Sequence, residues 1–288
     1  MSQTSDGPSP IIASFGLERT GDSSFRGSSV GDERRPVVFG GQLMGQMIVA
    51  ASRWDRGKAV KSLHLIFARA GTVELPVDLE LRPVHSGRAF ASTSATASQG
   101  DRVLSEGLLL LDSGEVDVIR HQVPLPPAVS PLDAPTVGQP EPGVELRLVD
   151  GVDLMTSAAT GPAEVNVWVR FADVPDEVAV HQALLSWYTD GFLIAAAMRP
   201  HEGIGQEQAH KSLSTGVIAH TLTFHEPFRA DAWMLIANRS LYAGRGRTYG
   251  EGHVFSEDGR LIASFAQESM IRKFRDEARP GGSASTAM

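Results

Sequence analysis

The stretch VFGGQLMGQMIVAASRW, residues Val38–Trp54, decides the fold, because its apolar residues recur at the spacing of one helix face. These residues are Leu43, Met47, Ile48 and Ala51. Four segments with the pattern of strands follow it: Leu63–Phe67, Val77–Arg82, Ala89–Ala97 and Val103–Leu111. The first half of the chain therefore predicts one long helix followed by an antiparallel sheet.

The second half repeats this order. Residues Val178–Met198 (VAVHQALLSWYTDGFLIAAAM) predict another long apolar helix. Four predicted strands follow: Val217–Phe224, Trp233–Leu241, Gly246–Val254 and Leu261–Ile271. Two such modules can pair their sheets within one chain, as two subunits of a dimer would. The predicted class is α+β.

Matching motifs support an internal duplication. Ser86-Gly87-Arg88 and Gly244-Arg245-Gly246 lie 158 positions apart, as do Gln99-Gly100-Asp101 and Glu257-Asp258-Gly259. His64 and His220 lie 156 positions apart and are expected at matching places. The glycines of the second motif pair fall between alternating strands, where a hairpin turn needs a positive φ.

The composition shifts between the two modules. Residues His121–Gly143 hold seven of the 17 prolines, which is typical of a linker or a surface wrap. We expect a first module over 1–112 with a flexible N-terminal tail, a linker over 113–162, and a second module over 163–274. Polar, glycine-rich residues 275–288 are expected to form a mobile tail.

Composition and charge exclude several functions. The chain has no cysteine, so disulfides and a thiolate nucleophile are excluded. A net charge of −8 argues against nucleic-acid binding. The N-terminus lacks the pattern of a secretory signal, and the longest uncharged apolar run is too short and polar to insert into a membrane. We expect a cytoplasmic protein.

Three patterns suggest chemistry that their context does not support. Gly27–Gly31 (GSSVG) fits a nucleophile elbow but lacks the buried strand and helix that the elbow needs, so a loop is expected. Gly244–Gly250 has no phosphate-loop spacing and favours a strand start, with Arg245 or Arg247 contacting ligand phosphates as the alternative. The histidines show no metal-ligand spacing, so no metal is predicted.

Two polar residues lie in apolar surroundings. Asp190 is the only charged side chain between His181 and Arg199, and burying an unpaired carboxylate costs several kcal/mol. It either faces solvent or an arginine, or it is held at an apolar cleft to orient or deprotonate a water. Gln267 falls on a mostly apolar strand face, where it either binds a water or carbonyl or bonds a neighbouring strand.

The chain resembles the acyl-CoA thioesterase II family, which has a double hotdog fold. The resemblance covers Phe15–Phe274 and is most specific in five stretches: Val38–Gln46, Ser62–Gly71, Pro175–Asp190, Phe224–Phe228 and Gly259–Arg272. It implies hydrolysis of acyl-CoA to a fatty acid and CoA, with an acyl-CoA substrate and no cofactor. Further assembly into a homo-oligomer is also expected from such folds.

The resemblance also implies site residues. Asp190 and Gln267 match the family's Asp and Gln, which hold the hydrolytic water together with a strand hydroxyl. The hydroxyl position falls on Val217, and the acidic position before His220 falls on Ala219, so both are apolar here. If the strand is regular, Thr215 and Thr221 share the face of Val217, and Thr215 is our candidate for this role.

A helix start completes the predicted site. Gly40, Gly41 and Gln42 begin the first helix, where backbone amides would polarise the thioester oxygen. Without a cysteine or a credible serine, water would attack directly. One alternative is an acyl-CoA-binding protein that has lost hydrolysis with the hydroxyl. A hotdog hydratase is another, but such enzymes usually place a His after the Asp, and Gly191–Met198 contains none.

Overall fold

A computed structural model describes residues 9–31, 36–136, 141–156, 158 and 160–274. The two tails expected to be mobile therefore lie almost entirely outside the described residues. Within the described ranges, no helix has the length and apolar character needed to cross a membrane. The cytoplasmic location stays a prediction.

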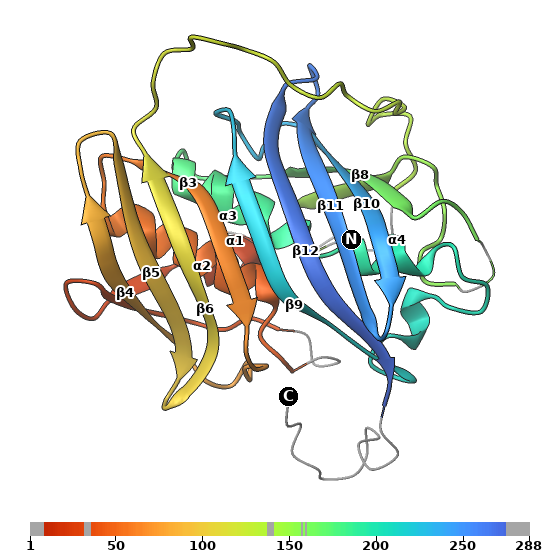
Figure 1. The fold of residues 1–288 in the computed structure, drawn as a ribbon, viewed down its shortest axis with the longest axis horizontal. Coiled ribbons are helices and arrows are strands. Elements are labelled where there is room, and N and C mark those ends of the chain that lie inside the picture. Colours follow the sequence, from red (N-terminus) through yellow and green to blue (C-terminus); the bar gives the residue numbers. More distant parts are fainter. Residues whose placement is uncertain (1–8, 32–35, 137–140, 157, 159, 275–288) are drawn as a thin grey trace, which may run out of the picture.

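Twelve strands form one continuous antiparallel sheet (Figure 1). The first half supplies β1 (Leu17–Arg19), β2 (Ser24–Gly27), β3 (Ala59–Phe67), β4 (Val77–Ser86), β5 (Phe90–Gln99) and β6 (Arg102–Asp112). The second half supplies β7 (Val144–Leu148), β8 (Glu164–Phe171), β9 (Leu213–Phe224), β10 (Met234–Gly244), β11 (Arg247–Ser256) and β12 (Leu261–Lys273). The order is β1-β2-β4-β5-β6-β3-β9-β12-β11-β10-β8-β7, so the two halves mirror each other across the β3–β9 pair.

The helices lie together on one face of this sheet, behind the strands in Figure 1. They are α1 (Pro10–Ser14), α2 (Gly40–Trp54), α3 (Val178–Thr189) and α4 (Leu193–Met198), followed by the short 3-10 helix η1 (Gln206–Gln208). The long helices α2 and α3 pack on each other and bury apolar side chains against the inner sheet face. Two helix-and-sheet modules joined through their sheets confirm the predicted α+β class.

The second helix differs from the prediction. The sequence predicted one helix over Val178–Met198, but α3 ends at Thr189 and α4 begins at Leu193. Thr189, Asp190 and Gly191 all have low helix propensity, and the apolar pattern on both sides concealed this break. Because of the break, Asp190 is the residue that caps α3.

A β-bulge occurs at the same place in β3 and in β9. In β3, the pairing with β6 shifts between Val60 and Ser62; in β9, the pairing with β12 shifts between Val217 and Ala219. Each bulge inserts one residue and changes which side chains face inward beyond it. Aligned on the bulge, Val60 and Val217 occupy equivalent places.

The bulges correct the predicted match of His64 with His220. Aligned through them, Leu63 is equivalent to His220, and His64 is equivalent to Thr221. His64 is exposed on the outer face, where its Nδ1 lies 3.3 Å from the Thr221 hydroxyl, whereas His220 is buried on the inner face. The sequence offset of 156 positions therefore matched two histidines that lie in opposite surroundings.

The hairpin prediction is confirmed by backbone geometry. Gly100, between β5 and β6, has φ 58°, and Gly259, between β11 and β12, has φ 84°. Arg245 and Gly246 also have positive φ, so the stretch weighed as a phosphate loop forms the tight turn between β10 and β11.

The segment that joins the modules covers the outer face of the second module. It runs from β6 past the upper ends of the strands in Figure 1 and then forms β7, a strand that the proline-rich composition did not predict. The Trp168 indole N–H donates to the Val129 carbonyl at 3.0 Å. Ala134 packs with Trp168, Trp233, Leu235 and Phe255 in a small apolar cluster. The short strands β1 and β2 and the longer strand β8 were not predicted either.

Candidate active site

Asp190 lies where α3 meets the beginning of α2. Its side chain is buried, and a Cβ built on Gly40 would sit only 2.7 Å from Asp190 Oδ2. A Cβ on Gly41 would sit 2.7 Å from Trp187 Cα, so the two glycines let the helices approach closely. The carboxylate therefore lies against the positive end of the α2 dipole.

The first amides of α2 precede its regular hydrogen bonds. The earliest bonds within this helix start run from Gln42 N to Phe39 O at 3.0 Å and from Leu43 N to the same oxygen at 3.4 Å. The Gly40 and Gly41 amides come before this ladder and point along the helix axis. The prediction that α2 begins at Gly40 is confirmed, whereas a substrate-binding role for its first residues stays a prediction.

The Gln42 side chain has another partner. Its Oε1 accepts from Val30 N and its Nε2 donates to Ser28 O, each at 3.0 Å. The amide thus ties the loop after β2 to the helix. The Ser29 hydroxyl in this loop donates to Leu75 O at 2.8 Å. That contact with a backbone carbonyl does not activate Ser29 as a nucleophile.

Gln267 is buried on the inner face of β12, and both ends of its amide are bonded. Its Oε1 lies 3.3 Å from His220 Nδ1, and its Nε2 donates to Ser269 Oγ at 2.9 Å. His220 is the residue directly opposite Gln267 in the register of β9 and β12. The amide is therefore fixed in orientation and keeps one N–H for a further acceptor.

His220 links Gln267 to the residue beside Asp190. Its Nε2 lies 3.2 Å from Thr189 Oγ1, and complete burial lowers the pKa of its imidazole to about 4. Because the Gln267 oxygen can only accept, the neutral ring carries its proton on Nδ1. Its Nε2 then faces the Thr189 hydroxyl, which donates to the Ser186 carbonyl at 3.0 Å. A continuous polar network thus runs from Thr189 through His220 and Gln267 to Ser269.

The structure separates the three hydroxyl candidates. Val217 faces inward, directly opposite Ser269. Thr215 shares this face, lies opposite Ile271, and places Oγ1 3.5 Å from His210 Nε2. Thr221, expected on the same face, lies on the outer face beside His64, because the bulge reverses the alternation. A catalytic role for Thr215 stays a prediction.

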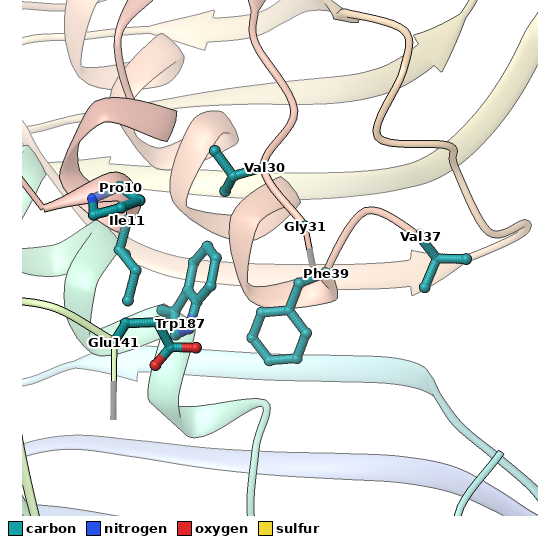
Figure 2. Close-up of a pocket in the computed structure, with 8 residues that line it drawn as sticks. All are labelled: Pro10, Ile11, Val30, Gly31, Val37, Phe39, Glu141 and Trp187. Atoms are coloured by element: carbon teal, nitrogen blue, oxygen red, sulfur yellow. The ribbon is translucent and has the colours of Figure 1, made fainter. Parts of the chain in front are cut away.

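A cleft of about 490 Å³ adjoins the start of α2. Phe39, which immediately precedes Gly40, and Trp187, on the last turn of α3, face each other with ring centroids 5.0 Å apart. Figure 2 shows these rings together with the other lining residues: Pro10, Ile11, Val30, Gly31, Val37 and Glu141. The lining of the cleft is mostly apolar.

Sequence reasoning missed several of these residues. His220 was expected to satisfy backbone groups at the start of a strand rather than to take part in chemistry, and neither Thr189 nor Ser269 was singled out. The available signal was the strand alternation, which puts Ser269 on the face of Gln267. In the described part of the chain, no group of three or more His, Asp or Glu side chains is placed to hold a metal.

Comparison with known families decides the relationship. The model of the acyl-CoA thioesterase C-terminal domain matches residues 120–271, and that of the acyl-CoA thioesterase N-terminal domain matches residues 32–111. The chain belongs to the acyl-CoA thioesterase II family.

One relative and two solved structures illustrate the similarity. An acyl-CoA thioesterase 2 from Haemophilus influenzae is 28% identical over 285 residues, covering 91% of this chain and 96% of its own. An acyl-CoA thioesterase II structure from Mycobacterium marinum is 28% identical, with a TM-score of 0.76 over 91% of this chain and 98% of that chain. A hot dog fold protein from Alicyclobacillus acidocaldarius, 20% identical, has a TM-score of 0.73 over 92% and 98% of the two chains. The double hotdog fold is thereby confirmed.

Proposed function

We propose that this family member hydrolyses acyl-CoA thioesters to a carboxylic acid and CoA. The observation that carries the proposal is the contact of Asp190 Oδ2 with Gly40 at the start of α2. In this arrangement Asp190 would act as a base beside amides that would stabilise an oxyanion. The names of the relatives support the substrate class.

Water would attack the thioester carbonyl directly. Asp190 accepts one water proton as the oxygen bonds to the carbonyl carbon, and the remaining Gln267 N–H holds the same water. The amides at the start of α2 stabilise the negative charge that develops on the carbonyl oxygen. When the C–S bond breaks, the CoA thiolate leaves and takes up the proton that Asp190 accepted, which regenerates the carboxylate.

The cleft between Phe39 and Trp187 would bind the substrate beside this site. Its apolar lining suits the acyl chain or the pantetheine arm, because burying apolar surface contributes about 25 cal/mol per Å². The volume of about 490 Å³ falls in the range of ordinary small-molecule pockets. A homo-oligomer remains part of the proposal, and sedimentation of the purified chain would measure it.

A thiol-release assay tests the function. Because the chain has no cysteine, a thiol reagent reports only the CoA that is set free. A panel of acyl-CoA chain lengths should give turnover, with calorimetry run in parallel. Heat of binding without thiol release would instead identify a binding protein.

The direct attack by water can be tested separately. In a single turnover in ¹⁸O-labelled water, direct attack puts the label into the product acid. Attack by the Asp190 carboxylate would transfer an unlabelled enzyme oxygen to the first product. An unlabelled first product would therefore contradict the proposed mechanism while leaving the hydrolase activity intact.

A further inference from the structure

The inner faces of β9 and β12 are complementary at one position. Val217, where the family's strand hydroxyl is expected, pairs directly with Ser269 across the two strands. Directly opposite residues in an antiparallel pair have Cβ atoms about 4.5–5.5 Å apart. The Ser269 hydroxyl on β12 therefore lies on the strand next to Val217, the position in β9 where the family's hydroxyl is missing.

Ser269 is also bonded to the residue assigned to the water. Its side chain is buried, and its Oγ accepts from Gln267 Nε2 at 2.9 Å. On the other side, His220 Nδ1 lies 3.3 Å from Gln267 Oε1. With one end held by His220 and the other by Ser269, the amide cannot flip without losing both contacts.

We propose that Ser269 is a positioning residue that replaces the missing strand hydroxyl by fixing the Gln267 amide toward the hydrolytic water. This inference rests on the proposed hydrolysis. One N–H of Gln267 is held by Ser269, so the other is directed to the water. The Ser269 hydroxyl also keeps its own proton to donate within the site.

The proposal has a natural comparison within the chain. The equivalent strand β6 carries Leu111 at the place of Ser269 and Leu109 at the place of Gln267, both buried. The hydroxyl and the amide thus occur together in the module that holds Asp190. In the other module, both positions are apolar.

The test is a double-mutant cycle measured by CoA release. Ser269→Ala should lower kcat about tenfold at unchanged KM, the loss expected when a buried donor loses its acceptor. In a Gln267→Ala background, the same change should have no further effect, because Ser269 acts through that amide. Ser105→Ala is the matched control: Ser105 is a buried serine in the first module, on β6, and its loss should leave kcat unchanged.

A second variant moves the hydroxyl rather than removing it. In the double variant Ser269→Ala with Val217→Thr, the hydroxyl returns to β9, and we expect recovery of most of the lost kcat. Melting curves for every variant show whether the fold is retained. Wild-type kcat in Ser269→Ala, or losses that multiply in the Gln267→Ala background, would overturn the role of Ser269.

These outcomes are separate from a failure of the proposed function. If the wild-type chain releases no CoA from any acyl-CoA, the hydrolase proposal fails. If the wild type is active and Ser269→Ala has the same kcat as the wild type, only the positioning role fails.

Discussion

The β3–β6 and β9–β12 strand pairs have the same backbone and opposite chemistry. Both pairs carry the bulge, and both have the same set of equivalent inward positions. In the first pair these positions hold Val60, Leu63, Leu109 and Leu111; in the second they hold Val217, His220, Gln267 and Ser269. Three apolar side chains are thus exchanged for polar ones without a change of framework.

This difference indicates where function was placed in a duplicated fold. A buried polar side chain is costly unless it is hydrogen-bonded, and the leucines of the first module show that the framework does not need polarity there. The second module meets that cost with a bonded network that ends beside Asp190. We infer one site in each chain, with the first module contributing the start of α2.

The comparison between the two modules is tested most strongly at the C-terminal ends of α2 and α3. Asp55 caps α2 as Asp190 caps α3, but Asp55 forms an ion pair with Lys58 at 2.8 Å. Asp190→Asn should lower kcat by about 10²–10⁴-fold, the usual loss for an acid–base group, with the fold intact. Asp55→Asn is the control and should keep kcat in the same thiol assay. Unchanged turnover in Asp190→Asn would make that residue structural.

The second module can also be converted to the chemistry of the first. Combining His220→Leu, Gln267→Leu and Ser269→Ala removes the network without overfilling the site. Activity should fall by roughly 10²-fold because the water loses its donor, while the melting temperature stays level or rises. A large drop in melting temperature would show instead that the network is needed for folding.

The sequence predicted the repeated order of elements well because each long strand or helix has a clear period. It did not predict the bulges, since one inserted residue in β3 or β9 leaves no mark in composition. The face assignment of Thr221, which lies beyond the bulge in β9, was therefore reversed. His64 was matched with the wrong residue because the offset used is one position away from the offset that aligns the two bulges. The short strands at the sheet edges carry too few residues to show a period.

The sequence also predicted only some of the residues in the candidate site. Asp190 and Gln267 came from the resemblance together with their apolar surroundings. His220 and Ser269 did not, because their roles depend on cross-strand pairing that only the register reveals. The contact of Asp190 with Gly40 joins residues of different modules, and no local pattern could have predicted it.

Acid stability separates the two modules through His220. Burial lowers the pKa of this residue to about 4, so below its usual value near 6.5 the unfolded chain takes up the proton and the folded chain does not. Stability from this group is therefore complete above pH 6.5 and falls toward pH 4, by up to about 3 kcal/mol.

Denaturant unfolding of the wild type and the combined variant checks this at pH 7.5 and pH 4.5. The wild type should lose more stability on acidification, because the variant lacks His220. His181 and His225, whose pKa values are also lowered by burial, are present in both proteins and cancel in the difference. Equal losses in the two proteins would mean that His220 is protonated within the fold.

The smallest expected effect belongs to Val217→Thr in the wild-type background. The change is nearly isosteric and adds a hydroxyl opposite Ser269, where the two side chains can bond each other. Since Ser269 already holds Gln267, we expect a gain in kcat/KM below about fivefold, the equivalent of one hydrogen bond of about 1 kcal/mol. The melting temperature should change little, because the new hydroxyl finds a partner. A larger gain would mean that the site lacks its hydroxyl, and a clear loss of stability without gain would place Val217 in a dry part of the core.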